Sequence, residues 1–61
     1  MKKNIKQVNE LSNGEIKLWI EQGSSIHLKS ITNYGDPVEL SSDEAIELAD
    51  LLMEMAKSIS D

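Results

Sequence analysis

The sequence predicts an α+β domain: an antiparallel β-meander of three to four strands packed against one C-terminal helix. Two observations predict this fold. Short segments of alternating apolar and polar residues fill the first two thirds of the 61-residue chain, separated by turn residues. A long apolar pattern with helical spacing follows Ser41. No repeat or linker divides residues 1–61, so we expect a single domain.

The first two strands are predicted at about residues 5–11 and 15–21, joined at Asn13-Gly14. Asn-Gly is typical of a type I′ turn, because both central residues of that turn need positive φ. This turn sets Glu10 opposite Lys17, a favourable charge pair. The alternation within 15–21 predicts a core face with Ile16, Leu18 and Ile20 and an outer face with Lys17, Trp19 and Glu21.

A third strand is predicted at about residues 26–32. We place a three-residue loop at 23–25, which sets Glu21 opposite His27 across the two strands. A two-residue loop would instead turn every side chain of the third strand to the other face of the sheet. The three-residue loop keeps Leu28 on the core face.

A short fourth strand is predicted at about residues 38–40, after a dense group of turn residues at 33–37. Pro37 would precede it, at a position where a missing N–H is tolerated. The strands and the helix together predict a core of nine residues: Ile16, Leu18, Ile20, Ile26, Leu28, Val38, Leu40, Leu48 and Leu52.

The C-terminal helix is predicted from Ser42 to about Ser58, after a capping box formed by Ser41 and Glu44. Its apolar residues cover an arc of roughly 220°, whereas a helix on the surface of a monomer needs about 100° or somewhat more. The extra width of this apolar arc predicts a homodimer, because pairing two copies would cover the surplus apolar surface. The predicted dimer interface consists of Ile46, Leu51, Met53 and Met55.

Composition excludes several kinds of site. The chain has no Cys and one His, so we expect no disulfide, metal or cofactor. The net charge is −5: residues 1–35 hold five Lys against three Glu, and residues 36–61 hold one Lys against eight acids. Direct nucleic-acid binding is therefore not favoured; it would use Lys2, Lys3, Lys6, Lys17 and Lys29. No membrane-spanning run or signal peptide is evident, which predicts a cytoplasmic location, bacterial or in a host cell.

We expect the protein not to be an enzyme. An exposed cross-strand pair explains His27 and Glu21 better than an acid–base pair does, because catalysis needs a surrounding cleft. Ser24 and Ser25 lack the motif of a nucleophile and fit a polar turn. The acids around Asp36 lack the spacing of a calcium loop.

Three segments precede the acidic, alanine-containing helix: Trp19-Ile20-Glu21-Gln22-Gly23, Ser25-Ile26-His27-Leu28-Lys29 and Gly35-Asp36-Pro37-Val38-Glu39-Leu40. This pattern resembles short uncharacterised bacterial and phage proteins over residues 19 to about 56. The resemblance implies a bacterial or phage cytoplasmic origin, and it implies no activity, cofactor or site residue.

Two surfaces are candidates for binding a protein partner. The first is the outer sheet face, where Trp19 lies near Lys29 and Ile31. Trp is enriched among residues that anchor interfaces. The alternative is that Trp19 packs with Val8 and the Lys29 stem as a minor second cluster. The second is an acidic helix stripe that either mimics a phosphate backbone or is an ordinary solvated face. The stripe consists of Asp43, Glu47, Asp50, Glu54 and Asp61.

The sequence therefore predicts a non-enzymatic protein-binding module that inhibits or regulates a larger protein. Its most concrete version is a phage-encoded inhibitor of a bacterial defence system, by analogy of size, charge and lack of catalytic groups. Two alternatives stay open. One is a bacterial accessory or antitoxin-like subunit that docks on one cognate protein, and the other is an acidic mimic of nucleic acid.

Overall fold

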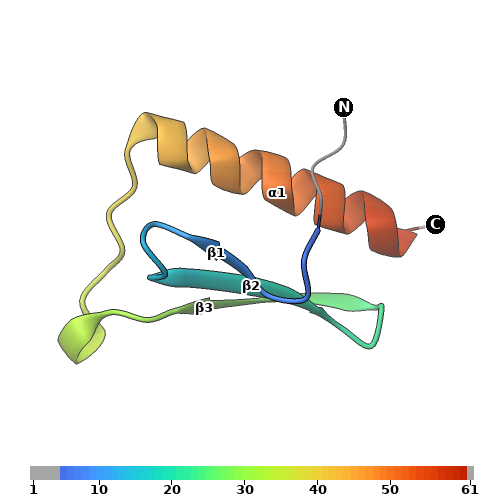
Figure 1. Ribbon diagram of the computed structural model, residues 1–61, viewed down its shortest axis with the longest axis horizontal. Helices are drawn as coiled ribbons and strands as arrows, with labels where there is room; N and C mark the ends of the chain where they lie inside the picture. Colours follow the sequence, from blue (N-terminus) through green and yellow to red (C-terminus); the bar gives the residue numbers. More distant parts are fainter. Residues whose placement is uncertain (1–4, 61) are drawn as a thin grey trace.

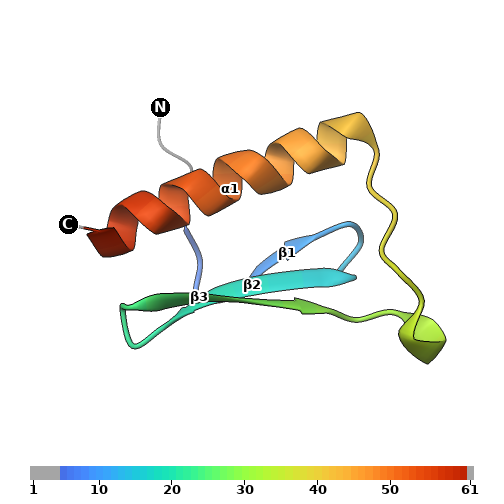
Figure 2. The ribbon, with the colours of Figure 1, turned by 180° about the vertical axis from the view of Figure 1, so that it is seen from behind.

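The computed structural model describes residues 5–60 and shows a three-stranded antiparallel sheet with one C-terminal helix, which confirms the α+β class. The strands are β1 (Asn9–Leu11), β2 (Ile16–Glu21) and β3 (Ser25–Ser30), with β2 in the centre. Helix α1 (Ser42–Ser60) lies over one face of the sheet, as Figures 1 and 2 show from opposite sides. No helix within the described residues is long and apolar enough to cross a bilayer.

The β1–β2 hairpin has the predicted register. Glu10 lies opposite Lys17, and the Glu10 Oε2 and Lys17 Nζ atoms are 3.5 Å apart in a partly exposed ion pair. The turn contains three consecutive residues at positive φ: Ser12 at 57°, Asn13 at 57° and Gly14 at 86°. Asn and Gly adopt this backbone region more readily than other residues, so the Asn-Gly pair explains why the chain reverses here.

β1 is shorter than the strand predicted at 5–11, because the Asn9 side chain closes a local turn. The buried Asn9 amide nitrogen donates to the Lys6 carbonyl at 3.0 Å and to the Leu18 carbonyl at 3.3 Å. The Asn9 amide oxygen accepts a hydrogen bond from the Lys6 N–H at 3.0 Å. Residues 5–8 consequently do not pair with β2.

The β2–β3 hairpin has a three-residue loop, as predicted, but the loop lies one residue earlier, at 22–24. His27 therefore lies opposite Trp19 rather than opposite Glu21, and the predicted Glu21–His27 pair is wrong. The first two loop residues have φ of 52° and 66° and reverse the chain early. Because the register moves by an even number of residues, the side chains stay on their predicted faces.

The predicted fourth strand at 38–40 is not formed. After β3 the chain makes a short 3₁₀ turn, η1 (Asn33–Gly35), and then continues without regular structure to α1. This connection leaves the end of the sheet and rises to the helix layer, so it does not run beside β3 (Figure 1). Val38 and Leu40 nevertheless pack against the core from the connection.

Helix α1 begins where the capping box predicts. The Ser41 Oγ accepts a hydrogen bond from the Glu44 N–H at 3.2 Å, and the Glu44 Oε1 accepts one from the Ser41 N–H at 2.9 Å. The Ser41 N–H, and after it the Ser41 hydroxyl, lower the pKa of the Glu44 carboxyl; desolvation opposes them, and the Ser12 hydroxyl adds a further lowering. The helix ends at Ser60, slightly beyond the predicted end.

The core lies between α1 and the sheet. Its buried apolar side chains are Ile16, Leu18, Leu51 and Met55. Partly buried residues surround them: Ile5, Leu11, Ile20, Ile26, Val38, Leu40, Leu48 and Leu52. Of the nine residues predicted as the core, Ile16 and Leu18 are buried, six are partly buried and Leu28 is 50% exposed, and the prediction missed Leu51 and Met55.

The rotation of α1 differs from the prediction. Leu51 and Met55 were expected at a dimer interface, but both are buried against the sheet, whereas Ile46 is 60% and Met53 57% exposed. The wide apolar arc permits several rotations. The observed rotation turns large side chains inward and leaves the helix alanines exposed, which buries more apolar area. A dimer through Ile46 and Met53 stays a prediction.

Candidate functional site

The outer face of the sheet, opposite α1, carries the largest candidate side chain. Trp19 lies in the central strand on this face, directly opposite His27. The two ring centroids are 5.7 Å apart and the ring planes are tilted by 47°. Aromatic rings favour such tilted contacts, so His27 supports one side of the indole. The His27 Nε2 also lies 3.1 Å from the Ser25 Oγ at the exposed surface.

The other side of Trp19 has no strand residue beside it. A longer first strand would have set Val8 opposite Trp19, but β1 begins at Asn9 and Val8 is 49% exposed outside the ladder. Within residues 5–60, no element forms a second layer on this face (Figure 2). Trp19 is accordingly partly exposed, although it occupies the central strand.

Lys29 and Ile31, the other predicted residues of this surface, lie on the same face. Lys29 is exposed on β3, opposite Lys17. The Ile31 N–H donates to the Glu15 carbonyl at 2.7 Å, which continues the ladder one residue beyond β3. By strand alternation Ile31 then faces the same side as Lys29, and it is 45% exposed. The structure thus places Trp19, Lys29 and Ile31 on one face, with the Lys17–Lys29 row between Trp19 and Ile31.

The acidic stripe of α1 forms a separate surface. Glu47 and Asp50 are exposed and Glu54 is partly exposed. None of these three carboxylates forms an ion pair with another described residue. The last residue of the predicted stripe, Asp61, lies outside the described part of the chain. The stripe and the outer sheet face belong to different layers of the fold.

Of the five lysines considered for nucleic-acid binding, Lys6 and Lys29 are exposed. Lys2 and Lys3 lie outside the described residues. Lys17 pairs with Glu10, which reduces the positive charge that it could offer to a phosphate. The structure therefore adds no support to direct nucleic-acid binding.

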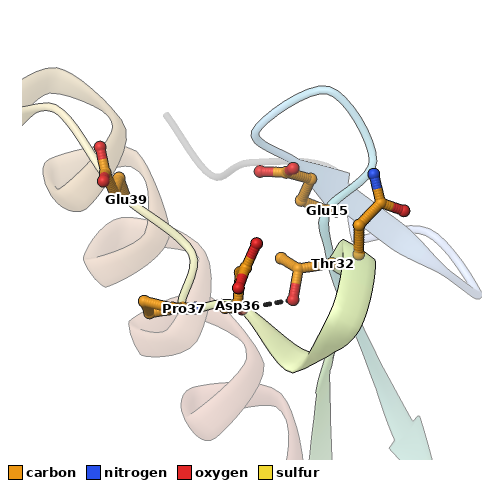
Figure 3. A pocket seen from close by; sticks show the side chains of 6 residues that line it. Glu15, Thr32, Asp36, Pro37 and Glu39 are labelled. Carbon is orange, nitrogen blue, oxygen red and sulfur yellow. Dashed lines mark hydrogen bonds between the residues drawn. The ribbon is translucent and has the colours of Figure 1, made fainter.

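An open polar pocket of about 430 Å³ lies beyond the end of β3, next to η1 (Figure 3). It is lined by Glu15, Thr32, Asn33, Asp36, Pro37 and Glu39. The Thr32 hydroxyl donates to the Asp36 carbonyl and closes one wall. In the described part of the chain, no group of three or more His, Cys, Asp or Glu is arranged to hold a metal ion. The pocket lining contains three carboxylates, one hydroxyl and no His or Lys.

Tyr34 is an exposed aromatic residue that the sequence prediction missed. It is 99% exposed in η1, and its φ of 59° lies in the left-handed region that a bulky residue rarely adopts. The prediction treated residues 33–37 only as a turn, although an aromatic residue inside a turn cluster was visible in the sequence.

Comparison with known proteins gives no relative for this chain: no family model, curated protein or solved structure matches it. The resemblance to short bacterial and phage proteins stays a prediction. A functional assignment therefore depends on the surfaces described above, of which the Trp19 face is the one with an aromatic side chain at its centre.

Proposed function

We propose that this protein binds another protein through the outer face of its sheet, with Trp19 as the anchoring side chain, and thereby inhibits or regulates that partner. The observation that carries the proposal is the position of Trp19 in the central strand, on the face without a helix. An antiparallel sheet covered on one face usually presents polar residues to solvent on the other. Trp19 departs from that pattern.

The energetics of binding favour this residue as an anchor. An aromatic side chain of this size buries about 150–250 Å², and loss of a central anchor costs about 2 kcal/mol or more of binding free energy. Lys17 and Lys29 form the next row of the outer face and add positive charge beside the indole, and Ile31 lies one row beyond them. The partner that fits this face has an apolar hollow for the indole beside an acidic residue.

A second candidate function uses the acidic stripe as a mimic of nucleic acid. The exposed carboxylates of Glu47 and Asp50, which form no ion pair with described residues, favour it. Such a stripe would occupy the phosphate-binding surface of a nucleic-acid-binding protein. Its affinity would fall steeply as salt rises, because exposed charges are screened, whereas binding through Trp19 would be less sensitive to salt.

The most concrete version of the proposal is a phage-encoded inhibitor of a bacterial defence system. The alternative is a bacterial accessory or antitoxin-like subunit that docks on one cognate protein. Both versions rest on the small size and acidic charge of the chain, which is an argument by analogy. They share the same binding face and differ in the identity of the partner.

Affinity capture with four forms of the protein tests the proposal. Wild type, Trp19→Ala, Tyr34→Asn and the double variant Glu47→Lys/Glu54→Lys would each be used on a lysate of cells in which the protein acts. Tyr34→Asn is the matched control, because it removes an exposed aromatic residue elsewhere and Asn tolerates positive φ. We expect Trp19→Ala alone to lose the partner. If only the double variant Glu47→Lys/Glu54→Lys fails to capture the partner, the result would support the acidic mimic instead.

A further inference from the structure

β3 is an edge strand with one open side. It is hydrogen-bonded to β2, and no other described segment runs along its second side (Figures 1 and 2). The opposite edge strand, β1, has three residues, whereas β3 has six in an uninterrupted register without proline. A long, regular edge strand is a template for adding another strand.

The open side of β3 presents the backbone groups of Ile26, Leu28 and Ser30. The Ile31 N–H donates to the Glu15 carbonyl at 2.7 Å, so the backbone groups of Ile31 point toward the neighbouring strand. In an antiparallel ladder this direction alternates from one residue to the next. The N–H and carbonyl groups of Ile26, Leu28 and Ser30 therefore point away from β2.

The side chains at this edge are incompletely covered as well. Leu28 lies opposite Leu18 on the helix side of the sheet, yet Leu28 is 50% exposed and Leu18 is 0% exposed. Ile26, on the same side, is only partly buried. Uncovered apolar surface and outward-pointing backbone groups thus occur on the same residues, and a further strand would cover both.

We propose that β3 pairs antiparallel with β3 of a second copy of this chain, about a two-fold axis beside His27. In this register Ile26 of each copy lies opposite Leu28 of the other. The outward backbone groups of these residues then bond to one another, and each half-covered side chain gains an apolar neighbour. The two sheets become one continuous sheet with both helices on the same face, as a closed two-fold interface allows.

Charge favours this register. Within one chain Lys29 lies opposite Lys17, and no described acid is within ion-pair distance of Lys29. In the proposed register Lys29 lies opposite Ser25 of the second copy, whose neighbour on β2 is Glu21 of that copy. Because Ser25 is small, the long Lys29 side chain can extend over it toward Glu21 of the second copy. The pairing thus adds an opposite charge on the open side of Lys29, while Lys17 stays its neighbour on β2.

This dimer would double the outer face without depending on the proposed function of that face. The two His27 side chains would lie side by side, so each Trp19–His27 pair would continue into the pair of the other copy. The two Trp19 residues would be separated by three strand spacings, roughly 14 Å. A two-fold symmetric partner, or one with two equivalent hollows at that spacing, would fit such a face.

Cysteine crosslinking tests the register. The chain has no Cys, so a single introduced Cys can form a disulfide only between two copies. We expect His27→Cys to oxidise to a covalent dimer with an unchanged circular dichroism spectrum, because its Cα atoms would lie about 4.5 Å apart, within disulfide range. Ser25→Cys is the matched control, since its two copies would lie about 13 Å apart along the strands. A crosslink through Leu28→Cys in place of His27→Cys would overturn this register.

Light scattering and a charge exchange test the pairing itself. Wild type should have twice the mass of one chain at micromolar concentration. Lys29→Glu and Glu21→Lys should each weaken the dimer about two- to fivefold, and their combination should restore it. Lys29→Glu places a carboxylate opposite Lys17, so the monomer fold should not be lost. A monomer mass for wild type at every concentration, with no crosslink through His27→Cys, would overturn the proposal.

Discussion

Leu18 and Trp19 are neighbours in the central strand and face opposite sides of the sheet. Leu18 is 0% exposed under α1, whereas Trp19 is partly exposed on the face without a helix. Strand alternation produces this division, and it separates a residue needed for folding from one that is free to bind. A small domain has little stability in reserve, so the division has measurable consequences.

Leu18→Ala and Trp19→Ala should differ in their effect on stability. Leu18→Ala leaves a cavity in the core and should lower the free energy of unfolding by about 2–5 kcal/mol. Trp19→Ala removes a surface contact with His27 and should lower it by about 1 kcal/mol or less. Urea denaturation followed by circular dichroism measures both. An equal or larger loss for Trp19→Ala would show that the indole is a core residue.

The rotation of α1 can be tested with two pairs of alanine variants. Leu51→Ala and Met55→Ala should each cost about 2–5 kcal/mol, because both side chains are buried. Ile46→Ala and Met53→Ala should stay within about 0.5 kcal/mol of wild type, because both side chains are exposed. Thermal or urea unfolding distinguishes the pairs. A large loss for Met53→Ala would instead indicate that the exposed side of the helix is covered in an oligomer, as the sequence predicted.

Asn9 should be required for the start of β1. Its side chain bonds to both backbone groups of Lys6 and to the Leu18 carbonyl. Asn9→Asp has the same shape but lacks the two amide donors, so it should lower stability at neutral pH by about 1–3 kcal/mol. Asn9→Ala should lower the stability by a similar amount. If Asn9→Asp unfolds at the same urea concentration as wild type, these hydrogen bonds do not hold the turn.

The helix cap should make stability depend on pH. Hydrogen bonds from Ser41 lower the pKa of Glu44 below its ordinary value of 4.5, so the unfolded chain takes up this proton at a higher pH than the folded chain does. The stabilisation is therefore complete above about pH 4.5 and is lost as pH falls through the folded pKa. Glu44→Gln should show a smaller loss of stability between neutral pH and about pH 3 than wild type shows. An identical loss in both proteins would remove Glu44 as the cause.

Local patterns in the sequence predicted those parts of the fold that local interactions determine. Asn13-Gly14 fixed the register of the first hairpin, because its backbone preference acts within the turn itself. The capping box fixed the start of α1 for the same reason. Trp19 was correctly placed on the face opposite the core, since alternation determines the face of every residue in a strand.

The errors arose where longer-range geometry decides the outcome. The rotation of α1 depends on which side chains best fill the space above β2, and an apolar arc of roughly 220° does not specify that. Residues 38–40 have the side chains of a strand, but they belong to the connection that leads from the sheet to the helix layer, so they do not lie beside β3. The exposure of Tyr34 depends on the path of that same connection, so the turn pattern alone did not indicate it.

The affinity of the isolated partner for Trp19→Ala is the most direct test of the proposed binding face. It should be measured beside wild type and Glu47→Lys/Glu54→Lys, each shown to be folded, at low and high salt. We predict that Trp19→Ala binds roughly thirtyfold more weakly than wild type, or weaker still, and that the charge reversal and the salt change have smaller effects. Equal affinity for wild type and Trp19→Ala would contradict the proposal that this protein binds through Trp19.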